Sequence, residues 1–254
     1  MKKITVSSPG KLMLFGEHAV VYNRPCLVTA VDQRLTVTVE FIDNPSFILN
    51  APDVGIVGYE KSIKELGLGE LPKGVKFVEI AVKNFVEKYR LAGGIKATTA
   101  SQFSSQFGFG SSSASTVCVL KALSELSGKK LDNNKLFNLA YKTVLDIQGK
   151  GSGFDVAAAI YGGTLYFLTG GKAINPLKVK ELPLVIGYTG VKADTVTIID
   201  QVKEKMKAQP ERVERIYDAI AKITEDAKIK YLKAIGRGWV NIWISIKNIY
   251  AIWG

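Results

Sequence analysis

Residues 108–114 read Gly-Phe-Gly-Ser-Ser-Ser-Ala and stand directly before an apolar run that ends at Gly128. The glycines let backbone N–H groups come close to a ligand, and the serines supply hydroxyl donors. A helix that begins here adds its free N–H groups and the positive end of its dipole. The segment therefore predicts a cradle for nucleotide phosphates. A plain serine-rich N-cap stays open, because the segment matches neither a Walker A loop nor G-x-G-x-x-G.

Around this segment, short strand patterns alternate with amphipathic helical patterns. Strands are predicted at residues 3–6, 12–15, 35–41, 95–99, 164–168 and 184–188. Helices are predicted at residues 74–91, 113–127, 133–148, 154–160, 195–207 and 211–234, the third of them capped by Asp132 or Asn133. Strands dominate the N-terminal part of the chain, and helices dominate the C-terminal part. We therefore expect an α+β or mixed α/β fold whose two parts meet near residues 170–185.

The composition of the 254 residues is that of a globular chain, with 47% hydrophobic and 22% charged residues. It excludes a disordered chain, a collagen-like repeat and a disulfide-rich mini-protein. Cys26 and Cys118 lack metal-ligand spacing, so we expect small buried residues in a reducing compartment. The first eight residues read as a strand, and no secretory leader is expected.

The net charge of +11 fits a phosphorylated small molecule, an anionic surface or nucleic acid, and also a solvated lysine-rich surface. The lysines are scattered and form no aromatic-interleaved stripe, so we expect no nucleic-acid partner. Residues 239–254 hold all three tryptophans and are too short and too polar to span a membrane, so no membrane partner is expected. They predict a buried element, a subunit interface that would make a homodimer, or an atypical end, truncated or altered in frame.

Two further segments carry candidate chemistry. Residues 8–21 (SPGKLMLFGEHAVV) place Lys11 on a Pro-Gly turn, and an apolar strand then delivers Glu17 and His18, the only histidine. Residues 149–155 (GKGSGFD) place Asp155 near the start of an alanine-rich helix. Taken singly, these residues also fit a solvated lysine, an exposed glutamate, a structural histidine and an N-cap aspartate.

In this order the three segments resemble the motifs of the GHMP superfamily of kinases, named for galactokinase, homoserine kinase, mevalonate kinase and phosphomevalonate kinase. PGKLMLFGEHAVVY is similar to P-G-K-x-x-L-x-G-E-H-x-V, GFGSSSAS to G-L-G-S-S-A-A, and SGFDVAAAIYGG to S-G-x-D-x-x-x-x-x-x-G-G. The resemblance implies an ATP- and Mg²⁺-dependent kinase of small molecules. It implies an ATP-binding domain like ribosomal protein S5 domain 2 at residues 1–180. A ferredoxin-like domain, incomplete or atypical, would follow at residues 181–254.

The resemblance implies roles for the residues of this chain that occupy the motif positions. Asp155 would be the catalytic carboxylate that accepts or orients the proton of the attacking hydroxyl. Lys11 would pair with Asp155, keep it ionised and stabilise charge on the transferred phosphoryl group. The phosphates would be held by Gly108, Gly110, Ser111, Ser112, Ser113 and Ala114, and Ser112 would also reach Mg²⁺. Glu17, His18 and Thr195 would line the acceptor pocket.

The identity of the acceptor is implied by resemblance to particular kinases within the superfamily. GEHAVVY (16–22) and TGVKADT (189–195) are most similar to mevalonate kinases, which implies a cytoplasmic enzyme that phosphorylates mevalonate for isoprenoid synthesis. QGKGSGFDVAAAIYG (148–162) also resembles phosphomevalonate kinases, so phosphomevalonate stays an alternative acceptor. Arg24 or Lys192 could then bind its phosphate.

Two departures from the superfamily pattern matter. Val144 stands where mevalonate kinases place a Mg²⁺-binding glutamate, and Asp146, two residues later, is turned by about 200° on a helix. The late glycine-rich motif of the family is absent from these 254 residues. A non-catalytic relative that binds nucleotide is therefore a second hypothesis. An RNA-binding S5-like domain is a third.

Overall fold

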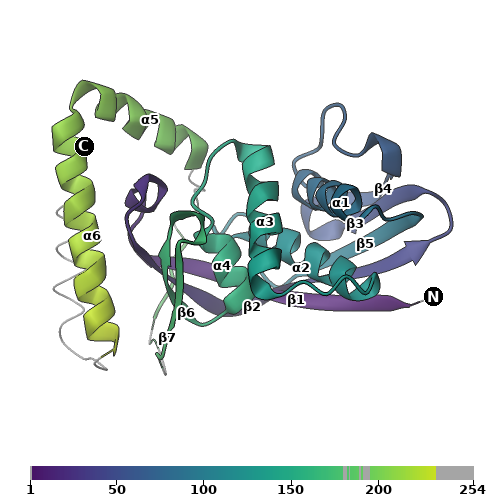
Figure 1. The fold of residues 1–254 in the computed structure, drawn as a ribbon, viewed down its shortest axis with the longest axis horizontal. Helices are drawn as coiled ribbons and strands as arrows, with labels where there is room; N and C mark the ends of the chain where they lie inside the picture. Colours follow the sequence, from purple (N-terminus) through teal and green to yellow (C-terminus); the bar gives the residue numbers. More distant parts are fainter. Residues whose placement is uncertain (1, 180–181, 183, 189, 191–194, 233–254) are drawn as a thin grey trace.

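The computed structural model describes residues 2–179, 182, 184–188, 190 and 195–232 (Figure 1). Among them, one seven-stranded sheet has the order β4-β3-β5-β2-β6-β7, with β1 paired to β2. The strands are β1 (Lys3–Phe15), β2 (Cys26–Ile42), β3 (Ser46–Ala51), β4 (Ile56–Ser62), β5 (Gly94–Ser101), β6 (Thr164–Leu168) and β7 (Ala173–Leu177). The helices are α1 (Lys76–Tyr89), α2 (Ser111–Leu126), α3 (Asn133–Gln148), α4 (Phe154–Tyr161), α5 (Thr195–Ala208) and α6 (Pro210–Leu232). Short 3-10 helices are η1 (Ala19–Tyr22), η2 (Pro52–Val54), η3 (Ile63–Glu65) and η4 (Thr169–Gly171).

The long strand β2 joins the two halves of the sheet. Its first residues, 26–29, pair antiparallel with β6, and residues 35–42 pair antiparallel with β5. β1 runs antiparallel beside it, with a shift of register between Pro9 and Lys11. The Pro-Gly turn predicted before Lys11 is therefore wrong. Because β2 offers hydrogen-bond partners on both sides of this point, residues 3–6 and 12–15 form one bulged strand.

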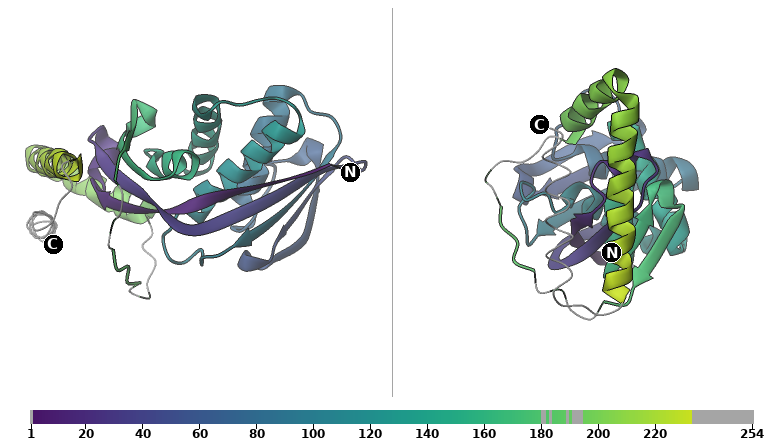
Figure 2. Two further views of the ribbon diagram at one scale, coloured as in Figure 1. Left: turned by 90° about the horizontal axis from the view of Figure 1, so that it is seen from below. Right: turned by 90° about the vertical axis from the view of Figure 1, so that its left-hand side faces the viewer.

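Helix α2 lies at the centre of the helical layer. Its residues are apolar or small on nearly every side, and residues 113–120 are all buried. A helix of this kind needs neighbours all round. α1, α3 and α4 pack around it on one face of the sheet (Figure 2). The predicted helices are confirmed, including the cap of α3, where Asp132 accepts a 2.8 Å hydrogen bond from the Lys135 N–H. The α+β class is confirmed as well.

Some strand predictions differ from the structure. β3, β4 and β7 were not predicted, and β3 pairs parallel with β5. The strand predicted at residues 184–188 is wrong, because this segment is irregular and Val185 is fully exposed. An apolar run forms a strand only where another strand offers it backbone partners. The N–H of Leu184 bonds instead to the nearby carbonyl of Leu182.

Helices α5 and α6 lie beyond one end of the sheet, beside the loop that contains η1 (Figure 1). No helix in the described part of the chain is both long and apolar enough to cross a membrane. Residues 239–254 lie outside the described residues, so the three interpretations of this segment stay predictions. The same holds for what the missing glycine motif implies. The described part of the predicted second domain contains these two helices, and its ferredoxin-like arrangement stays a prediction.

Both cysteines are buried and free, as expected from the apolar runs that contain them. Burial raises the pKa of the Cys118 thiol to about 12 and raises the pKa of the Cys26 thiol well above its ordinary value. Neither thiol ionises at neutral pH, so neither is a reactive nucleophile in the folded protein.

Gly94 is required where β5 passes between β2 and β3. A Cβ added there would lie 1.8 Å from the Asn44 carbonyl oxygen and 2.8 Å from that of Ser46. We expect Gly94→Ala to lower the free energy of unfolding by about 2–3 kcal/mol, because backbone must move to admit the methyl group. Gly187→Ala is the control, since nothing lies within 4 Å of its Cβ position. Equal urea midpoints for the two variants would contradict the packing described here.

Candidate active site

The N-terminus of α2 is the centre of the candidate site. Gly110 precedes the helix with φ 77°, and Gly108 has φ 75°, both in the left-handed region that favours glycine. No side chain caps this end of the helix. Its first-turn N–H groups, which have no partner within the helix, lie together with the positive end of the dipole. Ala114 is fully buried and donates its N–H to the Gly110 carbonyl at 3.0 Å, which closes the first turn.

Asp155 lies in the first turn of α4 and faces α2. Its Oδ2 accepts a 2.7 Å hydrogen bond from Ser113 Oγ, and its Oδ1 accepts one of 3.0 Å from the Val156 N–H. The N-cap of α4 is Gly153, not Asp155, so the plainer interpretation of this aspartate is wrong. The first turns of α2 and α4 thus meet through the Ser113–Asp155 hydrogen bond.

Lys11 reaches the same point from β1. Its N–H donates to the Phe109 carbonyl at 2.9 Å, which ties the strand to the glycine-serine loop. A Cβ built on Gly110 would lie 3.1 Å from Lys11 Cγ and 3.8 Å from Asp155 Cβ. The Lys11 Nζ lies 5.1 Å from the centre of the Phe154 ring, within cation–π range. The structure therefore brings Lys11 and Asp155 together on either side of Gly110, although 144 positions separate them.

The buried thiol of Cys26 lies beneath this group of charges. Its pKa is raised first by burial and then by the negative charges of Glu17 and Asp155, while the charge of Lys11 opposes them. A charge acts appreciably on a thiol only at short range. Glu17, Lys11 and Asp155 therefore all lie within electrostatic range of the Cys26 thiol.

Glu17 and His18 follow β1 in a tightly folded loop. Gly16 has φ 96°, and a Cβ there would lie 2.4 Å from the Pro25 carbonyl oxygen, so only glycine fits. His18 has φ 58° and ψ −51°, which is unusual for a residue other than glycine. Burial lowers the pKa of His18, so its imidazole is neutral at pH 7.

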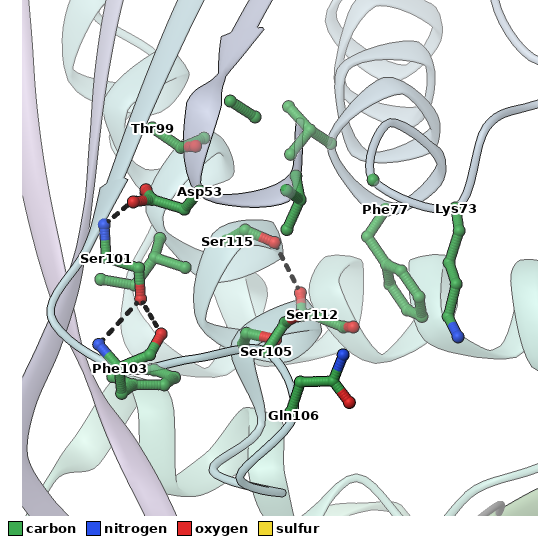
Figure 3. A pocket seen from close by; sticks show the side chains of 16 residues that line it. Asp53, Lys73, Phe77, Thr99, Ser101, Phe103, Ser105, Gln106, Ser112 and Ser115 are labelled. Carbon is green, nitrogen blue, oxygen red and sulfur yellow. Dashed lines mark hydrogen bonds between the residues drawn. The ribbon is translucent and has the colours of Figure 1, made fainter. Parts of the chain in front are cut away.

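A pocket of about 390 Å³ lies on the other side of the α2 N-terminus (Figure 3). Ser111, Ser112 and Ser115 of α2 form one wall, and Ser115 Oγ donates to the Ser112 carbonyl at 2.9 Å. Phe77 and Lys73 stand on one side of the opening and Asp53 on the other (Figure 3). Asp53 accepts a 2.8 Å hydrogen bond from the Ser101 N–H, which holds η2 against β5.

Ser111 and Ser112 in this wall were predicted from the sequence as phosphate-binding residues, whereas Ser115 and the rest of the pocket were not. The other lining residues are Leu35, Ala51, Asp53, Val54, Lys73, Gly74, Phe77, Val78, Thr99, Ser101, Phe103, Ser105 and Gln106. They come from separate strands, helices and loops, and no local motif marks them. The one signal available was the position of residues 104–107, directly before the glycine-serine loop.

The two positions considered for a magnesium carboxylate, Val144 and Asp146, both lie on α3. Val144 is buried, and its Cγ1 lies 3.7 Å from the Cβ position of Gly151. Asp146 accepts hydrogen bonds from Lys142 Nζ at 2.5 Å and from Asn84 Nδ2 of α1 at 2.9 Å. Burial raises the pKa of Asp146, but these two hydrogen bonds and the charges of Lys142 and Lys83 together outweigh it and leave the pKa lowered. Among the described residues, no cluster of three His, Cys, Asp or Glu side chains could hold a metal.

One predicted site residue is not described in full. Thr195 begins α5, but its side chain lies outside the described part of the structure, as do Thr189 and Lys192. The acceptor side of the site therefore rests on Glu17 and His18 alone.

The family described as "GHMP kinases N terminal domain" matches residues 76–163, which contain the pocket wall, the glycine-serine loop and Asp155. Mevalonate kinase of Pyrococcus horikoshii is 32% identical over 234 residues, which cover 90% of this chain and 69% of that protein. The chain belongs to the GHMP kinase family. It is therefore an enzyme, a kinase, and the names of its relatives imply a small-molecule substrate.

Solved structures confirm the fold of this GHMP kinase. The mevalonate kinase of Methanococcus jannaschii has a TM-score of 0.75 at 23% identity, over 98% of this chain and 80% of that chain. The phosphomevalonate kinase of Streptococcus pneumoniae, in complex with phosphomevalonate and AMPPNP, has a TM-score of 0.79 at 15% identity, over 97% and 79%. Identities this low show a shared fold. Kinases of this family use ATP.

The lowered pKa of His18 predicts a loss of stability in acid. An unfolded histidine has a pKa near 6.5, so below about pH 6.5 the unfolded chain binds the proton more tightly than the folded protein. Stability should therefore fall as the pH drops from about 6.5 to the folded pKa, by at most about 1.4 kcal/mol per unit. Urea unfolding of wild type and His18→Gln between pH 7.5 and 5.0 measures this contribution. Parallel pH profiles for the two proteins would contradict it.

Proposed function

We propose that this kinase transfers the γ-phosphoryl group of ATP to the hydroxyl of mevalonate and forms 5-phosphomevalonate for isoprenoid synthesis. One observation carries the proposal. The α2 N-terminus has a nucleotide-sized pocket on one side and the Ser113–Asp155 pair with Lys11 on the other. Archaeal relatives that are about 30% identical over most of this chain are named mevalonate kinase, which supports the choice of acceptor.

The pocket would hold the adenine base. Phe77 offers an aromatic face, while Asp53 and Gln106 offer polar groups at the rim. The phosphates would then lie over the first turn of α2, where backbone N–H groups and the hydroxyls of Ser111 and Ser112 can donate to them. The tight turns at Gly108 and Gly110 would let the phosphates approach the backbone closely.

The residues present fit a magnesium ion of the kind that nucleotides bring. Mg²⁺ is usually held by one or two carboxylates together with phosphate oxygens and water. The hydroxyl of Ser112 and the phosphates of the nucleotide would hold it in this site, since the described residues contain no cluster of three carboxylate, imidazole or thiol side chains. When bound, the ion neutralises charge on the phosphates.

Asp155 would act on the acceptor. Its carboxylate would take the proton of the mevalonate hydroxyl as that oxygen bonds to the γ-phosphorus and the bond to ADP breaks. The hydrogen bond from Ser113 would hold the carboxylate in position. The Lys11 ammonium would stabilise the negative charge on the transferred group. Glu17, His18 and Thr195 would orient the acceptor.

Arg24 argues against phosphomevalonate as the acceptor. Its guanidinium is engaged by two carboxylates of α6, at 2.9 Å from Glu214 Oε2 and 2.8 Å from Asp218 Oδ1. It would have to leave both to bind a second phosphate. Lys192, the other candidate, lies outside the described residues.

Three further expectations belong to this proposal. The chain would divide near residue 180 into an ATP-binding domain and an acceptor-side domain. The enzyme would work in the cytoplasm. It would form a homodimer, which analytical ultracentrifugation can test.

A coupled assay of ADP formation with a panel of acceptors tests the proposed reaction. We expect turnover with mevalonate and none with phosphomevalonate, homoserine or galactose. Binding of AMPPNP without turnover of any acceptor would favour the non-catalytic relative instead. Turnover of phosphomevalonate alone would overturn the choice of acceptor.

Asp155→Asn should lower kcat by at least about 100-fold, because the acceptor loses its proton acceptor. The dissociation constant of AMPPNP should change only a few-fold. Ser113→Ala should give a smaller loss, since the carboxylate remains but is no longer held. Asp146→Asn is the matched control, because this aspartate pairs with Lys142 and Asn84. Stopped-assay kinetics that show equal losses for Asp155→Asn and Asp146→Asn would remove Asp155 from the role.

Phe77→Ala should weaken AMPPNP binding by about ten-fold or more, because stacking of a base on an aromatic ring contributes about 1–3 kcal/mol. Leu68→Ala, at an exposed apolar residue that does not line the pocket, is the control. Calorimetry measures both. Unchanged affinity in Phe77→Ala would place the base elsewhere.

A further inference from the structure

The loop of residues 16–25 is anchored on α6, a helix that begins about 190 positions later. Arg24 makes the connection. Its Nε donates to Asp218 Oδ1 at 2.9 Å, its Nη2 to Glu214 Oε2 at 2.9 Å, and its Nη1 to the Tyr22 carbonyl at 3.2 Å. A single planar guanidinium thus joins two carboxylates of α6 to the backbone of the loop.

Apolar contacts strengthen this anchor. The ring of Tyr22 stacks on that of Tyr217, with centres 4.8 Å apart and planes at 19°. Ala19 is fully buried in a cluster with Val202 of α5 and with Val213, Tyr217 and Ile220 of α6. Residues 214, 217 and 218 share one face of the helix, since they are spaced by three and four. The core beneath the loop is therefore supplied by α5 and α6.

The backbone of the loop needs such support. His18 (φ 58°) and Asn23 (φ 60°) both have positive φ, which side-chain-bearing residues rarely adopt. Unfavourable conformations of this kind persist only where the surroundings hold them. Glu17 and His18, the acceptor-side residues of the proposed site, lie at the start of this segment.

Other contacts hold the loop from the opposite side. Thr169 Oγ1 donates to the Val20 carbonyl, and Lys172 Nζ donates to Asn23 Oδ1 at 2.9 Å. Loss of Arg24 would therefore loosen the loop without removing every anchor, so a variant should still fold.

We propose that Arg24 is a positioning residue for the acceptor, which fixes Glu17 and His18 by clamping their loop to Glu214 and Asp218. The inference rests on the proposed function for its kinetic consequence. Helix α6 thus sets acceptor affinity from outside the site. ATP, which would bind on the other side of α2, depends on none of these contacts.

The test compares Arg24→Gln with wild type in steady-state kinetics. We expect KM for mevalonate to rise at least ten-fold and KM for ATP to change less than two-fold. Lys207→Gln is the control, because it removes an exposed ion pair of α5, with Glu204, at a distance from the loop. Equal increases in both KM values would indicate a general structural effect and would overturn the proposal.

A double-mutant cycle tests the clamp itself. Glu214→Gln with Asp218→Asn should raise KM for mevalonate as Arg24→Gln does, and the triple variant should be no worse than either. Independent, multiplicative effects would show that Arg24 acts without the two carboxylates and would overturn the proposal.

Hydrogen exchange separates this inference from the proposed reaction. In Arg24→Gln, amides of residues 17–23 should exchange at least ten-fold faster, while those of residues 111–116 stay unchanged. This readout needs no substrate, so it holds even if wild type fails to phosphorylate mevalonate. Unchanged exchange in the loop would refute the clamp.

Discussion

The absence of a side chain at Gly110 is the constraint on which the site depends. Strand β1, the turn before α2 and the start of α4 all meet there. The aliphatic stem of Lys11 lies 3.1–3.2 Å from the position that a Cβ would occupy, and Asp155 Cβ lies 3.8 Å from it. The left-handed backbone at this residue also starts α2 in the direction that aligns Ser113 with Asp155. One glycine therefore sets both the approach of the charges and the orientation of the helix.

Helix α2 explains why the two halves of the site keep their places. It is buried on nearly every side, so the surrounding helices and the sheet fix its rotation about its own axis. That rotation turns Ser111, Ser112 and Ser115 toward the pocket and Ser113 toward Asp155. A close-packed helix of this kind holds its first turn rigidly, which suits a site that must align phosphates with an acceptor.

The sequence allowed much of the fold to be predicted, and the exceptions have physical causes. Helical periodicity located α1 to α6, and the resemblance located Lys11 and Asp155. β3 and β4 were not predicted, because they form strands only by pairing with β5 and with each other. No local sequence pattern shows this pairing. The strand predicted at residues 184–188 was wrong for the same reason, since none of the described strands pairs with them. The pocket was not predicted from the sequence, because its lining residues come from segments far apart in the chain.

The anchoring of residues 16–25 on α6 has a consequence for synthesis of the chain. The loop is among the first parts to leave the ribosome, yet Glu214, Tyr217 and Asp218 are made about 190 residues afterwards. At the usual 5–20 residues per second, roughly ten to forty seconds separate the two segments. During that interval the sheet and its helices can form, while Tyr22 and Arg24 remain without their partners on α6. The loop that carries Glu17 and His18 therefore gains its anchor on α6 only after the sheet and its central helices have been made.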